Sequence, residues 1–565
     1  MVVGRCVDLT FGGVYGMTSR IANAFGWYFA LGMISIYAFS QGVGQQLLNT
    51  SLQYYALDTL SLASEEWNRL KSFTNLPWQL KPIIGYVSDV QLLPCGGYRR
   101  NPFLIAGALL GMLSAGALYG LAGTAVIPGV GIVLVLGLTL RLGAALIDVM
   151  MDALLAEHAG KRPDLTADMQ GLQMTSIAIL YVIVPLLTGS VLQKDGTQPL
   201  FAYSFAAFLW VIIPAACRWV EETARPSTAE DGLATSASCR SLCDTDTKVR
   251  AAKAAVLTSS WALIIGVLNI TYGAEHAFTI GAVSEVGNFV LCLLLYFLLR
   301  PLDEYIPRVA IFCYLFNSLY PQSTALFEWQ HAPSAKLAND LRCKTEQECL
   351  VLDPSIEDVN GLPCGWASSR GMPCLSPTSM ATLDAMGALF FVLATGFYTS
   401  LLQGVSYRTM LTATFAGRVL ASVFDYLLVT RYNLVLGISD FSWLLMYRFF
   451  VATNFRLLMM PLFTLFTQLC PPGFEGTIFA LLMGLENSGD ASGHYLGSQV
   501  LNLLGGVRKP DFENIEMFPI VQGWLTLLTM ALIPFLIPHG RPSDSLRMGS
   551  VRKTGQHHDS DVVLM

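Results

Sequence analysis

Charged residues are scarce in this sequence. Asp, Glu, Lys and Arg make up 13% of the 565 residues, whereas soluble domains contain about 25%. Hydrophobic residues reach 53%, which is more than a soluble core can use. A bilayer can accommodate them, because helices that face lipid must be apolar on their outer side as well. The composition therefore predicts a polytopic α-helical membrane protein.

Two further absences narrow the function. The chain has a formal net charge of -6 and no large cluster of basic residues, so nothing indicates a nucleic-acid partner. The first twenty residues, through Arg20, lack the compact apolar core and small-residue cleavage site of a signal peptide. We therefore expect the first apolar span to be retained as the first membrane helix.

Four of the 12 cysteines lie in one polar loop at about 331–379: Cys343, Cys349, Cys364 and Cys374. Four cysteines in one loop on the oxidising side of a membrane indicate two disulfides. A zinc site is the alternative, but no C-x-x-C pair favours it. We expect disulfides, and we expect neither a metal nor another cofactor.

Crossing a bilayer takes roughly 20 apolar residues per helix, and about fourteen stretches of the chain are long enough. They lie at about 25–57, 66–88, 101–122, 130–157, 169–192, 199–219, 251–273, 277–299, 308–329, 380–403, 410–431, 441–469, 475–504 and 516–538. The sequence thus predicts an all-α fold of about 14 transmembrane helices.

Basic residues set the orientation of these spans. Arg99, Arg100, Lys161, Arg162 and Arg408 all fall on one side if the spans simply alternate, and the side rich in Lys and Arg is cytoplasmic. The cysteine loop then lies outside the cell, in agreement with the disulfides. We expect the plasma membrane as the location.

The spans divide into two sets of six and one extra pair. We expect a cytoplasmic N-terminal segment 1–24, a six-helix bundle 25–219, a mobile cytoplasmic linker 220–250, an extra helix pair 251–300, a second bundle 301–538 that contains the loop 331–379, and a disordered tail 539–565. Two six-helix bundles joined by a cytoplasmic linker are typical of secondary carriers.

Three charged residues share one face of the fourth span. Arg141, Asp148 and Asp152 follow steps of seven and four, which places them within about 40° on a helix. Charge near the bilayer centre costs several kcal/mol and marks functional sites by default. We expect these residues to bind solute, with Asp148 and Asp152 as the sites of proton coupling. The alternative is a structural ion pair with neighbouring helices.

Other polar residues of the spans are candidates for binding the solute. Lys81 and Trp78 lie one turn apart, where the lysine could meet an aromatic anion or could instead extend to the membrane surface. Arginine binds carboxylates through two parallel hydrogen bonds. A polar residue that is isolated in a span more often joins two helices. The remaining candidates are Gln41, Gln45, Arg448, Arg456 and Asn487.

The loop after the second span reads GYVSD at 85–89 and GYRR at 97–100. It resembles the loop motif of the major facilitator superfamily. An acid and bases at neighbouring helix ends can pair in one conformation and separate in another. We therefore expect a cytoplasmic gate made of Asp89, Arg99, Arg100, Glu157 and Glu475.

Longer segments make the resemblance more specific. They read YYALD at 54–58, LPWQLKPIIG at 76–85, DVMMDALLAE at 148–157 and CPPGFEGT at 470–477. Together these segments resemble the folate–biopterin transporter family, a branch of the facilitator superfamily, over about residues 26–538. The resemblance implies import of folates, pterins or, in some members, S-adenosylmethionine.

Three classes of function compete. A membrane enzyme needs a compact catalytic set, and none is evident. A channel or receptor needs a symmetric pore element or a large ligand domain, and the outer loop of roughly fifty residues is too small for a typical one. A carrier needs paired bundles, midplane charges and gate motifs. We therefore expect a proton-coupled importer of a small polar solute that works by alternating access.

Overall fold

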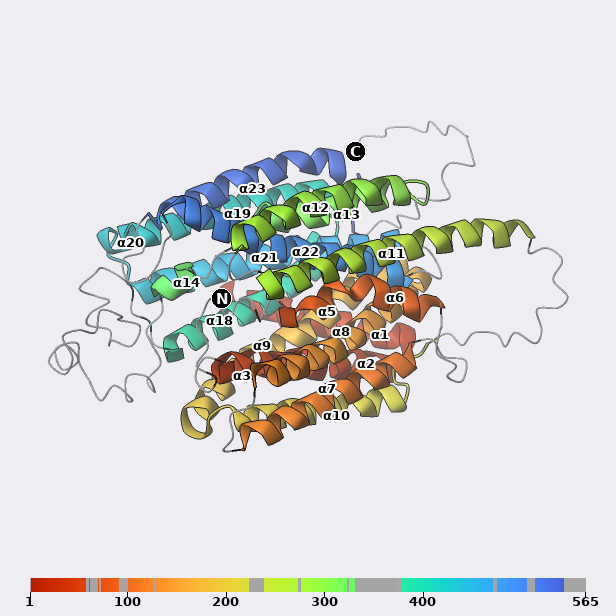
Figure 1. Ribbon diagram of the computed structural model, residues 1–565, viewed down its shortest axis with the longest axis horizontal. Coiled ribbons are helices and arrows are strands. Elements are labelled where there is room, and N and C mark those ends of the chain that lie inside the picture. The colour runs from red at the N-terminus through yellow and green to blue at the C-terminus, as the bar shows by residue number, and fades with distance from the viewer. Residues whose placement is uncertain are drawn as a thin grey trace.

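The computed structural model of the chain describes residues 2–56, 60, 70, 73–90, 100–124, 129–222, 238–272, 276–322, 325–330, 373, 375, 377–470, 475–505 and 514–542. Helices dominate these residues and run side by side along the long axis of the molecule (Figure 1). The helices α1 (Val2–Phe25) and α2 (Trp27–Tyr37) are separated by Gly26, whose φ of 90° suits glycine.

The first span is one continuous helix with a π-helical segment in its middle. The order along the chain is α2, η1 (Ala38–Gln45) and α3 (Gln46–Tyr54). The N-terminal half continues with α5 (Leu76–Gln79), α6 (Lys81–Val90), α7 (Asn101–Ala122), α8 (Val130–Lys161), the 3₁₀ turn η3 (Pro163–Leu165), α9 (Thr166–Asp195) and α10 (Gln198–Ala216).

The extra pair consists of α11 (Ser238–Tyr272) and α12 (Ala277–Leu299). The C-terminal half contains α13 (Tyr305–Ser318), α14 (Ala325–Gln330), α18 (Pro377–Phe397), η6 (Tyr398–Leu402), α19 (Tyr407–Val429), α20 (Tyr432–Val435), α21 (Asp440–Leu469), α22 (Glu475–Leu503) and α23 (Met517–Leu536). Ser406 and Ser439 begin α19 and α21, and each hydroxyl accepts a hydrogen bond from a backbone N–H of the first turn.

Ten helices of the described residues are long and apolar enough to cross a membrane. Their outer faces carry exposed large apolar side chains, such as Leu113 at 62% and Phe297 at 69% exposure, which a bilayer would cover. The prediction of a polytopic helical membrane protein is confirmed. The count of 14 spans stays a prediction.

Two predicted boundaries are wrong. The linker 220–250 is helical from Ser238, and α11 projects beyond the other helices (Figure 1). No proline or glycine occurs at 238–250, so nothing in the backbone stops α11 from extending. The span 308–329 is too long, since α13 ends at Ser318 before Pro321, and a proline disfavours helix at the residue before it.

The two halves meet along two seams. One seam is formed by α6 with α22, and the other by α9 with α18. At the first seam the backbones of α6 and α22 touch each other. A Cβ atom added at Gly85 would clash with the backbone carbonyl group of Gly476. The extra pair covers this seam, with α11 against α6 and α22 and with α12 against α13 and α22.

Helix α1 lies across the second seam. Gly13 packs on Gly396 of α18 and on Ser400 of η6, while the Arg20 guanidinium binds the Asp168 carboxylate of α9 at 2.7 Å. The predicted N-terminal segment 1–24 is therefore a helix that contacts both halves.

Candidate functional site

A buried ion pair lies inside the N-terminal half. The Lys81 ammonium on α6 lies 2.5 Å from the Asp148 carboxylate on α8. Lys81 is 1% exposed, so it does not extend to the membrane surface. Gln41 on η1 donates a hydrogen bond to the same carboxylate. The pair thus joins three helices at one acid.

The second acid of α8 belongs to the same cluster. Asp152 lies one turn beyond Asp148 and accepts hydrogen bonds from the Tyr37 hydroxyl at 3.0 Å and from the Gln173 amide at 2.9 Å. Sequence reasoning missed Tyr37 and Gln173. The signal for Gln173 was a glutamine within an apolar stretch of α9, whereas an isolated tyrosine gives no signal.

An aromatic ring completes the surroundings of the ammonium. The Lys81 Nζ atom lies 4.4 Å from the centre of the Trp78 ring, a distance at which a cation is attracted to the ring face. The two carboxylates outnumber the one ammonium. Uptake of one proton would therefore make the cluster of Lys81, Asp148 and Asp152 electrically neutral.

Arg141 does not join this cluster, although its spacing predicts the same face of α8 as Asp148 and Asp152. Its guanidinium donates hydrogen bonds to Asn75 and to Asn49, the latter at 2.8 Å. Arg141 lies about two turns along α8 from Asp148, roughly 10 Å by helical rise. The facing helices present amide oxygens at that level, and these amides accept from the arginine.

The C-terminal half contains a buried arginine on α21. Arg456 is fully buried, its Nε donates to the Thr395 hydroxyl at 2.5 Å, and its guanidinium carbon lies 4.3 Å from the centre of the Phe391 ring. Its two terminal nitrogens have no hydrogen-bond partner among the described residues. This guanidinium can therefore bind an anion.

The other predicted solute-binding residues lie elsewhere. Arg448 pairs with Asp384 at 3.1 Å, and both side chains are partly exposed. The Asn487 amide donates to the Met483 carbonyl one turn earlier at 2.8 Å, so it is engaged within its own helix. Gln45 ends η1 and is half-buried.

The helix ends predicted to be cytoplasmic meet at a second buried cluster, centred on Arg100. Its guanidinium lies 3.5 Å from Asp89 and 3.3 Å from Glu475, and it also pairs with Glu157. Arg100 is fully buried. Asp89 comes from α6 and Glu475 from α22, so the cluster bridges the two halves of the chain.

Further hydrogen bonds secure this cluster. Asp89 accepts from the backbone N–H and the hydroxyl of Thr477 at 2.7 and 2.8 Å. The Glu222 carboxylate accepts from the backbone N–H of Arg100 and of Asn101 at the start of α7, where a helix dipole favours an acid. Sequence reasoning missed Thr477 and Glu222.

Some predicted residues lie outside the described residues. They are Arg99 of the gate and the loop cysteines Cys343, Cys349, Cys364 and Cys374. The disulfides and the contribution of Arg99 therefore stay predictions.

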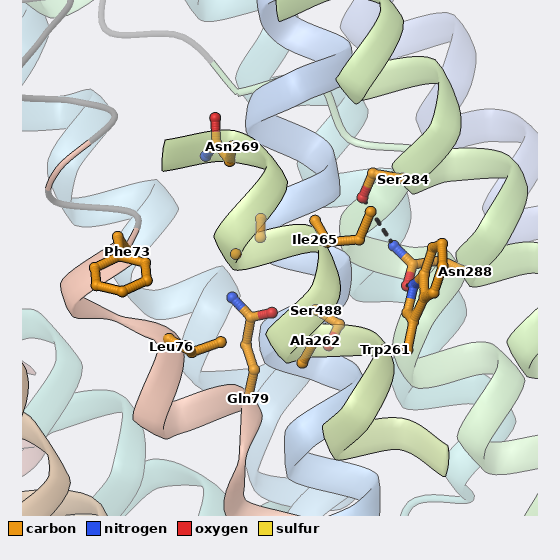
Figure 2. A pocket seen from close by; sticks show the side chains of 12 residues that line it. Phe73, Leu76, Gln79, Trp261, Ala262, Ile265, Asn269, Ser284, Asn288 and Ser488 are labelled. Atoms are coloured by element: carbon orange, nitrogen blue, oxygen red, sulfur yellow. Dashed lines mark hydrogen bonds between the residues drawn. The ribbon is translucent and has the colours of Figure 1, made fainter. Parts of the chain in front are cut away.

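A small cavity lined by both polar and apolar residues lies between the extra pair and the first seam (Figure 2). Its volume is about 30 Å³, which suits a water molecule and no larger solute. Asn288 of α12 donates to Ser284 at 3.3 Å and to Ser492 of α22 at 2.9 Å. The polar side chains that line the cavity are Gln79, Asn269, Ser284, Asn288 and Ser488.

Comparison with known proteins gives the same classification for most of the chain. The model of the BT1 family matches residues 41–554. The chain is 24% identical over 516 residues to the probable folate-biopterin transporter 2 of Arabidopsis thaliana, covering 91% of this chain and 83% of that protein. It is also 24% identical over 524 residues to the folate-biopterin transporter of a Synechocystis strain, covering 92% and 84%.

Solved structures share the fold. An auto-inhibited POT family peptide transporter is 12% identical, with a TM-score of 0.53, covering 90% of this chain and 96% of that one. The peptide transporter POT in complex with sulfate is 18% identical, with a TM-score of 0.53, covering 92% and 98%. The predicted facilitator-type fold is confirmed.

Proposed function

Because this chain belongs to the BT1 family, we propose that it is a transporter that imports folate- or pterin-type solutes by alternating access, driven by protons. It is a multi-pass membrane transporter and not an enzyme. Membership of the family supports a transporter, and we add the identity of the solute and the coupling to protons as proposals.

The buried cluster of Lys81, Asp148 and Asp152 is the observation that carries the proposal. Two acids and one base inside a membrane protein are costly, and such groups are retained where they serve a pathway or relay. The cluster joins α6, α8, η1 and α9, so a change in its charge acts on four segments at once. Protonation of one acid can therefore bias the helices between two arrangements.

The Arg100 cluster supports alternating access. It holds α6 and α22, which belong to different halves, at the predicted cytoplasmic ends. Solute can reach the cytoplasm only if these ends separate. We propose that Asp89, Arg100, Glu157 and Glu475 are the cytoplasmic gate, which is closed in this conformation.

The choice of solute rests on the relatives. Both relatives described above bear the name folate-biopterin transporter, one of them as probable, and the family resemblance adds S-adenosylmethionine as the alternative. Residues proposed to contact the solute near the centre are Trp78, Lys81, Gln41, Asp148 and Asp152. Uptake of radiolabelled folate into vesicles, competed by biopterin and S-adenosylmethionine, identifies the preferred solute.

Proton coupling gives a direct test. In vesicles with an imposed inward proton gradient, the protein should accumulate solute. Asp152→Asn should abolish the response to the gradient, because the asparagine side chain has no carboxyl group to bind and release a proton. The control is Asp164→Asn, since Asp164 is 61% exposed and pairs only with Arg162 among the described residues. Uptake by the unaltered protein that ignores the gradient would refute coupling.

The membrane that holds the protein is a further proposal. We propose the plasma membrane, although the probable folate-biopterin transporter 9 of Arabidopsis thaliana is named as chloroplastic. Imaging of a fluorescent fusion decides between a surface and an organelle location.

A further inference from the structure

We infer that Arg456 is the carboxylate-binding residue of the transporter, and that it selects solutes with an anionic tail over those without one. The inference rests on the proposed function and makes it more specific. Arg141 and Arg448 are also candidates from the sequence, and their contacts in the structure set them apart from Arg456.

The hydrogen-bonding groups of Arg456 are mostly unused. A guanidinium has five N–H donors, and the described residues supply one acceptor, the Thr395 hydroxyl. Both terminal nitrogens are buried without a hydrogen-bond partner among the described residues. Buried donors of this kind are rare, because each loses its water without replacement. The site therefore calls for an acceptor with two oxygens.

Other buried cations have their acceptors within the chain. Lys81 pairs with Asp148, and Arg100 pairs with three carboxylates. Arg141 donates to two asparagine oxygens and Arg418 to the Phe316 carbonyl. Arg456 differs from these four because both of its terminal nitrogens lack a hydrogen-bond partner among the described residues.

The position of Arg456 suits a solute held between the halves. Helix α21 packs against α8 and α9 of the N-terminal half. Arg456 lies about 24 Å along α21 from Asp440, and Asp148 lies about 27 Å along α8 from Val130, by helical rise. Both helices begin on the predicted outer side. Arg456 and the cluster of Lys81, Asp148 and Asp152 therefore lie at a similar depth on opposite sides of the interface.

Neighbouring groups fix the orientation of the guanidinium. Phe391 lies against it at 4.3 Å and Thr395 holds Nε, so the side chain is anchored at one edge and one face. The terminal nitrogens form the edge that binds a carboxylate through two parallel bonds. Folate carries two carboxylates on its glutamyl tail, whereas biopterin carries none. Arg456 should therefore distinguish these two solutes.

Binding to the purified full-length protein tests the inference. Arg456→Lys keeps the charge but loses the planar fork. It should weaken folate and p-aminobenzoylglutamate by about 10- to 100-fold, the equivalent of one charge-assisted hydrogen bond, and leave biopterin affinity unchanged. The matched control is Arg448→Lys, whose partner Asp384 is half exposed, and which should alter none of the three. Equal weakening of folate and biopterin, or no weakening of folate, overturns the inference.

A second measurement needs no variant and so does not depend on folding. The unaltered protein should bind p-aminobenzoylglutamate at least about tenfold more tightly than its diamide, which cannot accept two bonds at one charged group. Equal affinity overturns the inference. If the diacid is preferred but neither folate nor biopterin is transported, the carboxylate site stands and the proposed solute is wrong.

Discussion

Replacement of Lys81 with methionine is expected to destabilise the protein by about 3–5 kcal/mol, because the change leaves the Asp148 charge buried without its partner. Lys81 is 1% exposed, and its ammonium lies 2.5 Å from that carboxylate. The expected observation is a marked fall in the melting temperature and the folded yield of the purified protein.

The double variant Lys81→Met, Asp148→Leu separates stability from function. The double variant leaves no unpaired charge from this ion pair. Replacing a buried ion pair with apolar residues of similar volume often changes the free energy of unfolding little. We expect the melting temperature to recover and proton-driven uptake to remain absent. The control is Arg448→Met, which breaks a partly exposed pair and should cost at most about 1 kcal/mol. If Lys81→Met were as stable as the unaltered protein, the Asp148 carboxylate would not be a buried charge that depends on Lys81.

The Arg100→Gln variant is expected to open the predicted cytoplasmic end and abolish transport. Glutamine cannot balance Asp89, Glu157 and Glu475, which would then repel one another across the seam of α6 and α22. Cys470 reports the opening, since it lies beside this cluster and its thiol donates to the carbonyls of Phe466 and Glu475. In a chain whose other cysteines are serine, its labelling by maleimide should rise about tenfold or more, the effect of 1.4 kcal/mol on the equilibrium.

The control for Arg100→Gln is Arg162→Gln on the same side. Arg162 is about half exposed and pairs with Asp164 at 2.7 Å, and exposed pairs contribute at most about 1 kcal/mol. Its loss should leave Cys470 labelling and transport unchanged. Normal transport by Arg100→Gln would remove the cluster from the mechanism.

The sequence was most informative where short motifs mark helix ends. Asp89, Arg100, Glu157 and Glu475 stand in four separate segments, and the structure brings all four together. A charged side chain at a helix end can reach only the groups at neighbouring helix ends. Its position in the sequence therefore largely determines its partners. The role of these residues as a gate stays a prediction.

The sequence was least informative about partners within the membrane. Spacing placed Arg141 on one face with Asp148, but a seven-residue step also separates them along the helix by roughly 10 Å. Which groups face each level depends on the packing of other helices. Asn49, Asn75 and Tyr37 come from segments distant in the chain, and the period of one helix contains no information about them.

The extra pair also determines what kind of insertion the chain can tolerate at this junction. The helices α11 and α12 lead the chain away from the predicted cytoplasmic side and back again, so an even number of crossings separates α10 from α13. A single added helix would invert every later helix and carry Arg408 to the opposite side, against the charge bias that orients membrane proteins. A helical hairpin is therefore the smallest insertion between the halves that preserves their relative direction. Insertions and deletions in this region are therefore limited more by the need for an even number of membrane crossings than by their length.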